Sequence, residues 1–309
     1  MGNRLSQVNA IDEKFVASAP GKKHICVIGA GSSGLVVMKE LTKLGHKVTC
    51  FESLPAIGGV YVKSYQNTIL TTSSLLTAWS DHSDGKEDQP KFWTAEEYIQ
   101  YMNNFAEKFD LLKNICFSHD VLIVKKCKES EKWMVTVKGG RGCSAIERCE
   151  TILEDPLAEP YTLSFDGIAI CTGTNTFAAK LNFPGQDRFK GEKIHRDDSP
   201  RCLLFTISGT PIFSTTGELV HSQYYRCPDR FVGKRVLVIG SGESGSDITN
   251  EISKVALKCA ISIRGLHGHL IPRIQGNGRV TDLNTNRVRY SNPYIFGSYI
   301  GYVNQQAKR

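Results

Sequence analysis

Two glycine-rich loops, each between a short apolar run and a helical pattern, constrain the fold of this chain more than any other feature. The first loop, Gly29-Ala30-Gly31-Ser32-Ser33-Gly34, follows the apolar run Ile25–Ile28. The second, Gly240-Ser241-Gly242-Glu243-Ser244-Gly245, follows Arg235–Ile239. A G-x-G-x-x-G loop between a strand and a helix is typical of a dinucleotide-binding βαβ unit. The sequence therefore predicts an α/β fold with two Rossmann-like domains, built of parallel sheets with flanking helices.

The residues around the first loop complete one such unit. Apolar residues recur at helical spacing between Ser32 and Leu44, and Gly45 stands where a helix C-cap belongs. Val48–Phe51 predicts the next strand, and Glu52 follows it, 23 residues after Gly29. A carboxylate at this point can accept hydrogen bonds from a ribose, which favours an adenosine with a free 2′-hydroxyl.

Each position of the first loop has an expected role. Gly29 permits the tight turn, Gly31 lets the backbone approach a pyrophosphate, and Gly34 allows the helix to pack closely on the strand. Ser32 and Ser33 open the helix, whose first N–H groups would face the phosphates.

The second loop lacks the acid. The same count of 23 residues from Gly240 reaches Ile263, and Arg264 follows it. A missing acid with an arginine nearby is the arrangement for a 2′-phosphate. Arg226 and Arg273 are further candidates, and each of the three is alternatively a solvated surface arginine. Together the loops predict FAD at the first and NADPH at the second, a pair in which hydride passes to the flavin.

Further patterns complete the outline. Val121–Val124 and Trp133–Val137 predict strands, the latter away from the first βαβ unit, and Asp166–Cys171 predicts another buried strand. Thr94 to Phe109 predicts a helix that begins with a capping box of Thr94 and Glu97. We expect a flexible tail at 1–22, an FAD-binding domain at 23–178 and an NADPH-binding domain at 179–309.

Charge and composition exclude several classes of protein. The net charge is +7, and no Lys/Arg run has the density of a nucleic-acid-binding tail. No apolar run is long enough for a transmembrane helix, and no secretory signal follows Met1. The ten cysteines form no C-x-x-C and the histidines no metal-ligand pattern, so we expect reduced thiols, no metal and a cytoplasmic protein. N-myristoylation at Gly2 or peripheral membrane association is an alternative, and a homodimer stays open.

Other motifs carry a resemblance to a known family. Gly58-Gly59-Val60-Tyr61 follows the first acid, and Phe189, Gly191 and His195 form an F-x-G-x-x-x-H core between the two loops. With these motifs, residues 23–273 resemble the flavin-containing monooxygenases, the N- and S-oxygenating group of class B flavoprotein monooxygenases. Gly59, Val60 and Tyr61 are accordingly expected at the FAD.

The resemblance implies a function. It implies that NADPH reduces FAD, that O₂ adds to form a C4a-(hydro)peroxyflavin, and that a soft nitrogen or sulfur nucleophile such as N,N-dimethylaniline takes one oxygen. The partners would be O₂ and a small-molecule substrate, without nucleic acid. Alternatives are an uncoupled NADPH oxidase, a Baeyer–Villiger-type oxygenase, or an inactive isoform that binds nucleotide.

Two departures from the family pattern concern the flavin. Tyr61 stands where the family typically has Trp. The family's Asn, thought to hold NADP⁺ and the oxygenated flavin, falls on Thr71, next to Thr72. A threonine lacks the paired donor and acceptor of an amide, so faster peroxide leakage is expected. The alternative is that Thr71 only packs a turn.

The other departures concern the second domain. Gly191–His195 recurs as Gly217–His221, and removal of 196–221 would give F-x-G-x-x-x-H-x-x-x-Y once, ending at Tyr225. We therefore interpret 196–221 as an insert, either a surface loop or a segment that disturbs the fold. Either His195 or His221 could fill the histidine position of the motif, and the residues that follow His221 match the motif better. The chain ends at Arg309, before the family's return to the FAD domain, so truncation is expected.

Overall fold

The computed structural model describes residues 21–83, 90–140, 143–146, 150–151, 160–174, 192–194, 203–207, 218–263, 273–274 and 280. The chain divides into two compact units. The first contains the described residues within 1–63 and 99–176, and the second those within 64–98 and 177–309. The segment 64–98 thus groups with the second glycine loop, not with the first.

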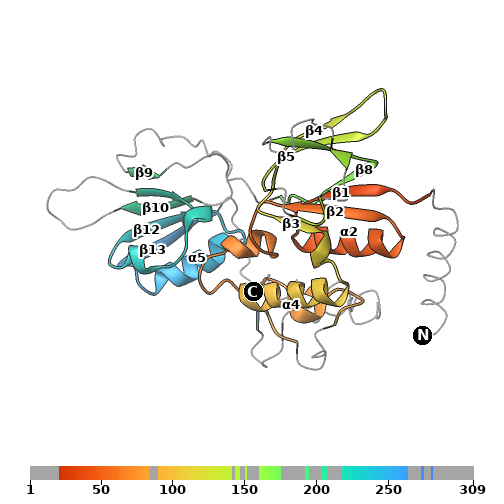
Figure 1. Cartoon of the computed structure of the whole chain (residues 1–309). Coiled ribbons are helices and arrows are strands. Elements are labelled where there is room, and N and C mark those ends of the chain that lie inside the picture. Colours follow the sequence, from red (N-terminus) through yellow and green to blue (C-terminus); the bar gives the residue numbers. More distant parts are fainter. Residues whose placement is uncertain are drawn as a thin grey trace. The chain divides into compact units, whose positions relative to one another are not determined.

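A four-stranded parallel sheet forms the centre of the first unit (Figure 1). The strand order is β3-β2-β1-β8, with bounds β1 (His24–Ile28), β2 (Lys47–Glu52), β3 (Ile115–Phe117) and β8 (Gly167–Ile170). Helix α2 (Ser32–Lys43) connects β1 to β2 and buries Leu35 and Met38 against the sheet. The predicted βαβ unit is confirmed, and this order is that of one half of a doubly wound sheet.

The predicted helix ends are confirmed as well. After α2, Gly45 has φ +79°, and the N–H groups of Gly45 and His46 donate to the carbonyls of Thr42 and Leu41, at 2.9 and 3.0 Å. This is a Schellman motif, which satisfies carbonyls that the helix leaves unpaired. Helix α4 (Ala95–Lys108) begins with the capping box, in which Thr94 and Glu97 bond each other's N–H groups at 3.0 and 3.2 Å.

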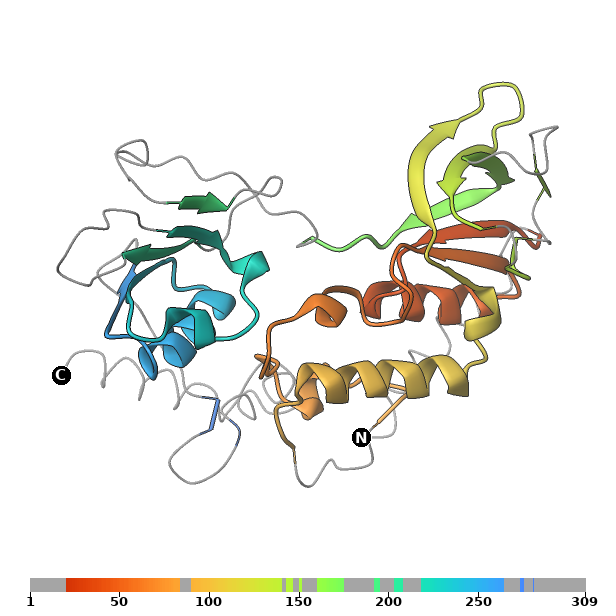
Figure 2. The same ribbon diagram turned by 60° about the vertical axis from the view of Figure 1, so that its left-hand side comes forward.

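The first unit also contains an antiparallel sheet, seen in yellow and green in Figure 2. Its order is β4-β5-β7-β6, with bounds β4 (Asp120–Lys126), β5 (Trp133–Lys138), β6 (Glu150–Thr151) and β7 (Tyr161–Phe165). Val135, Leu163 and Phe165 from this sheet pack with Cys26 and Phe51 from the parallel sheet. The two sheets of the unit therefore share one apolar core.

One cysteine expectation is wrong. Cys116 of β3 is joined to Cys143 by a disulfide, with the Cα atoms 5.7 Å apart. The missing C-x-x-C argued against a dithiol, but a disulfide requires proximity in space only. Six other cysteines in the described part of the chain are not in disulfides: Cys26, Cys50, Cys127, Cys171, Cys227 and Cys259.

The second unit contains a mixed five-stranded sheet, packed on α5 (Glu243–Ser253). Its order is β13-β12-β10-β11-β9, with bounds β9 (Glu192–Ile194), β10 (Leu203–Ile207), β11 (Glu218–His221), β12 (Arg235–Ile239) and β13 (Lys258–Ser262). β12 and β13 run parallel, as the predicted second βαβ unit requires. β10 runs antiparallel to both β12 and β11.

This sheet changes the interpretation of residues 196–221. Both β10 and β11 lie within that segment, and β10 pairs with β12 along five residues, from Leu203 opposite Ile239 to Ile207 opposite Arg235. The segment therefore contributes strands to the sheet and is not only a surface loop. β11 also pairs in parallel with β9, with Glu218 opposite Glu192. The described residues of the two motif copies, 192–194 and 218–220, thus lie side by side in register.

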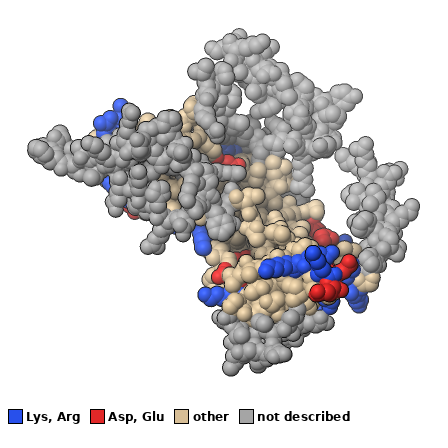
Figure 3. Space-filling view, turned by 90° about the horizontal axis from the view of Figure 1, so that it is seen from above, with Lys and Arg blue, Asp and Glu red and all other residues tan. Residues whose placement is uncertain are grey.

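Short helices and surface features complete the description. The short helices are η1 (Gly59–Lys63), α3 (Ser74–Thr77), η2 (Leu112–Asn114), η4 (Ser222–Tyr224) and η5 (Asp229–Phe231). No helix within the described ranges has the length and apolar character needed to cross a bilayer. On the described part of the face in Figure 3, basic and acidic side chains are intermixed, so they do not form a patch of one sign there.

Candidate functional site

The first glycine loop has the backbone geometry of a tight strand-to-helix turn. Gly29 has φ +102°, and its N–H donates to the carbonyl of Phe51 at 2.8 Å. A Cβ on Gly29 would lie 2.6 Å from the carbonyl oxygen of Cys171, and one on Gly34 would overlap the carbonyl oxygen of Gly29. The structure itself therefore requires glycine at both positions.

Gly31 differs from these two glycines. It is the N-cap of α2, with φ −78° and ψ −172°, an extended conformation that any residue adopts. Among the described residues, the nearest atom to a Cβ there would be the Cα of Gly59, at an ordinary contact distance of 3.5 Å. The fold thus tolerates a methyl group at Gly31. Close approach of a bound group is the remaining reason for glycine, as a pyrophosphate over the start of α2 would provide.

The other predicted FAD residues surround this helix start. Glu52 is buried at the end of β2, and its carboxylate accepts the N–H groups of Ala30 and Leu54 at 2.7 and 2.8 Å. A carboxylate offers about four acceptor positions, so capacity for a ribose hydroxyl remains. The remaining candidates are the partly exposed Ser32, the exposed Ser33, and Gly59, Val60 and Tyr61, which open η1.

The second loop repeats the geometry of the first. Gly240 has φ +100°, and its N–H donates to the carbonyl of Ser262 at 2.9 Å, as Gly29 does to Phe51. The N-cap Gly242 has φ −68° and ψ 177°. A Cβ there would meet no described atom within 4 Å. Of the other candidates, Ser241, Glu243 and Ser244 are exposed, and Gly245 is buried in the first turn of α5.

The equivalence of the loops identifies what replaces the acid. Because Phe51 and Ser262 accept the corresponding N–H groups, the residue after each occupies the same structural position. That residue is Glu52 at the first loop and Ile263 at the second. Isoleucine cannot accept a hydrogen bond from a ribose hydroxyl, so the two loops differ in the chemistry they offer to a nucleotide.

Two of the three candidate arginines, Arg226 and Arg273, have protein partners. Arg226 donates through Nη1 to the carbonyls of Gln223 and Tyr225, both at 2.7 Å. Arg273 forms an ion pair with Asp247 at 2.7 Å and also bonds the carbonyls of Ile69 and Leu70, each at 3.0 Å. Arg264 lies outside the described residues, as do Gly2, Phe189, Gly191 and His195. A 2′-phosphate contact stays a prediction for all three arginines.

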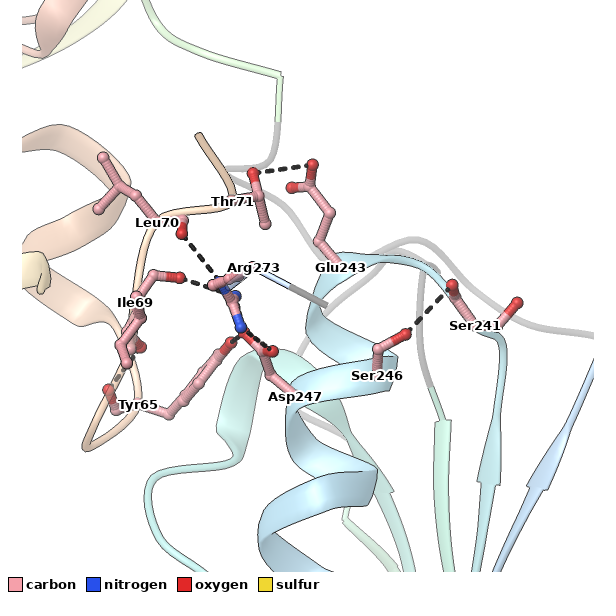
Figure 4. Close-up of polar contacts among 10 residues, drawn as sticks. Tyr65, Ile69, Leu70, Thr71, Ser241, Glu243, Ser246, Asp247 and Arg273 are labelled. Atoms are coloured by element: carbon pink, nitrogen blue, oxygen red, sulfur yellow. Dashed lines mark hydrogen bonds and ion pairs between the residues drawn. The ribbon is translucent and has the colours of Figure 1, made fainter. Parts of the chain in front are cut away.

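Thr71 and Thr72 are exposed and lie just before α3. Thr71 donates through its hydroxyl to Oε1 of Glu243 at 3.1 Å (Figure 4). Thr72 shares a hydroxyl–hydroxyl hydrogen bond of 2.7 Å with Thr77. Thr71, expected from the sequence at the family's asparagine position, therefore contacts the first residue of α5, inside the second glycine loop.

Sequence reasoning named Glu243 only as a member of the glycine loop and did not identify Asp247 or Glu251, which also anchor this region. Glu243, Asp247 and Glu251 lie four residues apart along α5, so they share one helix face. We call these three residues the acidic stripe. Besides the contacts of Glu243 and Asp247 above, Glu251 accepts the hydroxyl of Tyr225 at 2.6 Å. The spacing of the carboxylates was the available signal, but their partners lie far away in the sequence.

The signature residues His221 and Tyr225 enclose η4. Nδ1 of His221 accepts the N–H of Gln223 at 3.0 Å and so caps η4, while burial lowers the pKa of His221. Tyr225 is fully buried in the core with Phe231 and Ile248. Burial raises the pKa of Tyr225, and the hydrogen bond to Glu251 raises it further. Both residues therefore stabilise the second unit.

Comparison with known proteins identifies the family to which the chain belongs. The sequence profile described as "Flavin-binding monooxygenase-like" matches residues 22–207 and 206–292. The chain is 35% identical over 244 residues to a 4-hydroxybenzoate brominase (decarboxylating) of Pseudoalteromonas luteoviolacea, covering 78% of the chain and 38% of that protein. It is 34% identical over 273 residues to human flavin-containing monooxygenase 2, covering 83% of the chain and 42% of that protein.

Among solved structures, the S-allyl-L-cysteine S-oxygenase of Allium sativum matches with a TM-score of 0.60 at 21% identity, over 83% of this chain and 54% of that one. This likeness shows the α/β fold. The chain spans less than half the length of both curated relatives above. Because the profile match extends over most of the chain, the protein belongs to the flavin-binding monooxygenase-like family.

Proposed function

We propose that the chain is the cofactor-binding part of an FAD- and NADPH-dependent monooxygenase that oxygenates soft nitrogen or sulfur nucleophiles. The observation that carries this proposal is the pair of N-cap glycines, Gly31 and Gly242. Each stands at a helix N-terminus after a central strand, in a backbone conformation open to other residues. Neither has a described neighbour that would exclude a methyl group, which fits two sites where a pyrophosphate approaches the backbone.

The chemistry at the strand ends supports the choice of nucleotide. Glu52 lies beside the first loop, held by the N–H of Ala30, where a ribose 2′-hydroxyl could be accepted. At the second loop the equivalent strand-end residue is Ile263, which has no carboxylate to repel a 2′-phosphate. This difference favours FAD at Gly31 and NADPH at Gly242. When bound, these groups would supply hydride transfer and the activation of O₂.

The chain's own residues would bind and orient these groups. The first turns of α2 and α5 present N–H groups, and their helix dipoles favour anionic phosphates. Thr71 would present a hydroxyl at the family's asparagine position, where it now bonds Glu243. The relatives support oxygenation of a soft nucleophile, since they include human flavin-containing monooxygenase 2 and a macaque dimethylaniline monooxygenase that forms N-oxides.

The test is to titrate the purified chain with FAD and with NADPH by isothermal calorimetry. Oxygen transfer to a tertiary amine and to a thioether is then followed by mass spectrometry. We expect both cofactors to bind and the product to gain one oxygen. Consumption of NADPH with peroxide as the only product would instead identify an NADPH oxidase. Binding without consumption would identify an inactive nucleotide-binding protein, and a folded chain that binds neither cofactor would refute the proposal.

A second candidate follows from the bacterial relatives. Two of them are 4-hydroxybenzoate brominases, 35% and 34% identical to this chain. Bromide is also a soft nucleophile, so the same oxygen-donating chemistry could act on it. The oxygen-transfer assay should therefore be repeated with bromide and 4-hydroxybenzoate. Formation of a brominated phenol, without oxygenation of the amine or thioether, would favour this candidate.

A further inference from the structure

Arg273 makes four hydrogen bonds that connect two separate parts of the second unit. Its Nη1 and Nη2 atoms donate to the two carboxylate oxygens of Asp247, at 2.9 and 2.7 Å. Its Nε and Nη2 atoms donate to the carbonyls of Leu70 and Ile69, both at 3.0 Å. A guanidinium has five N–H donors in a fixed plane, so these acceptors engage most of its capacity. Arg273 is therefore a cross-link between α5 and residues 69–70.

Tyr65 strengthens the same connection. Its hydroxyl donates to Oδ2 of Asp247 at 3.1 Å, so that oxygen accepts bonds from both Tyr65 and Arg273 (Figure 4). Burial, followed by the nearby Asp247 carboxylate, raises the pKa of Tyr65 and keeps the phenol protonated as a donor. The hydrogen bond to Asp247 raises the pKa of Arg273.

The cross-link is shielded from solvent more than an ordinary surface ion pair. The side chains of Arg273 and Asp247 are 29% and 20% exposed. Exposed ion pairs contribute little because water and salt screen them, whereas a bidentate pair with additional hydrogen bonds holds a defined geometry. Here Arg273 holds the backbone carbonyls of Ile69 and Leu70, the two residues immediately before Thr71.

We propose that Asp247, Arg273 and Tyr65 form a clamp that positions residues 65–71 on α5 and thereby sets the hydroxyl of Thr71 beside Glu243. The three are positioning residues, since the contacts described above join them to other residues of the chain. A role of Thr71 in the reaction rests on the proposed function, whereas the clamp itself consists of contacts within the chain. Helix α5 is the element to which the clamp attaches residues 65–71, because Asp247 lies one turn after Glu243 on the acidic stripe.

The experiment measures amide hydrogen exchange by mass spectrometry in the whole chain, without cofactors. The variants are Asp247→Asn, which removes the charge at nearly constant shape, and Arg273→Lys, which keeps the charge but loses the planar fork. The amides of Thr68 and Leu70 report on the segment, since they donate to the carbonyls of Tyr65 and Trp93. We expect exchange in residues 65–71 to become at least about tenfold faster in both variants, with β12 and β13 unchanged.

The matched control is Glu251→Gln. It alters the next carboxylate of the acidic stripe, which accepts the hydroxyl of Tyr225 and not a donor from Arg273; Tyr225 in turn packs on Tyr65, with ring centroids 5.7 Å apart. Exchange should rise most around η4, and the rise in 65–71 should be smaller than in either main variant. If either main variant fails to fold, Tyr65→Phe keeps the ion pair and should give a smaller rise confined to 65–71. Unchanged exchange in 65–71, an equal rise throughout the second unit, or full protection in Arg273→Lys would overturn the clamp.

A second readout separates the clamp from the proposed function. In the FAD-loaded protein, Asp247→Asn should raise the hydrogen peroxide released per NADPH consumed, because Thr71 is no longer held in place. A localised rise in exchange without any NADPH consumption in the unaltered protein would retain the clamp and reject the proposed function. A change in peroxide release with unchanged exchange in 65–71 would reject the clamp.

Discussion

Gly31 and Gly242 are the glycines of the two loops at which no described neighbour and no backbone conformation requires the lack of a side chain. Gly29 and Gly240, with φ +102° and +100°, need glycine for their backbone conformation, and Gly34 needs it to avoid Gly29. The sequence motif assigns separate roles to these glycines, and the structure shows at which of them the fold itself requires glycine.

We predict that Gly31→Ala and Gly242→Ala each weaken one cofactor site without loss of stability. Alanine is compatible with both backbone conformations, so the free energy of unfolding should stay constant or rise by up to about 1 kcal/mol. FAD affinity should fall at least about tenfold in Gly31→Ala only, and NADPH affinity in Gly242→Ala only. Calorimetry and urea denaturation measure both quantities. The control Gly34→Ala should fail to fold, because its Cβ would overlap the carbonyl of Gly29.

His221 predicts a pH dependence of stability. Burial lowers its pKa below the ordinary 6.5, and its Nδ1 must stay unprotonated to accept the N–H of Gln223. Below about pH 6.5 the unfolded chain therefore binds more protons at this residue than the folded chain does. Its contribution is present above that pH and is lost as the pH falls.

The variant His221→Asn should show this contribution. Asparagine also caps a helix start but does not titrate. The decline in the free energy of unfolding between pH 7.5 and 5.5, measured by urea denaturation, should be shallower in the variant. Parallel declines in the two proteins would contradict the prediction.

At the scale of elements, periodicity predicted what is local. The strands and helices of both βαβ units and the capping box of α4 follow from nearest-neighbour patterns, and the structure confirms them. β10 was missed although Leu203–Ile207 is a short apolar run, because the repeated motif around it suggested an insert. A repeat shows that a segment is duplicated but not which strand it pairs with, since pairing depends on residues distant in sequence.

We predict that Phe205→Pro unfolds the second unit. Phe205 is central in β10, opposite Leu219 of β11 and Leu237 of β12. Proline removes a ladder donor and does not fit a central strand, so the loss should exceed about 2 kcal/mol. Leu203→Pro is the control, because proline is tolerated at the first residue of a strand. Equal thermal stability of Phe205→Pro and the unaltered protein would show that β10 is dispensable.

At the scale of the whole molecule, each unit contains one glycine loop and its own core, so the two cofactors should stabilise different parts of the chain. FAD should slow hydrogen exchange in β1, β2 and α2, and NADP⁺ in β12, β13 and α5. At 100 times its dissociation constant, each ligand should add about 2.7 kcal/mol to the unit that binds it. Gly242→Ala should remove the NADP⁺ effect and keep the FAD effect. Protection of both units by one ligand would argue against separate sites.

The sequence by itself determined the α/β class, the two glycine loops and the acid that distinguishes them, because these depend on short-range spacing and on the few residues that fit a tight turn. The tertiary structure alone decided the pairing of β10 with β12, the Cys116–Cys143 disulfide and the engagement of Arg273 by Asp247 and residues 69–70. Each of these joins groups that are far apart in the sequence. The sequence does not show whether an arginine is available to bind a phosphate or already bonds a loop, because only its neighbours in the folded protein distinguish the two.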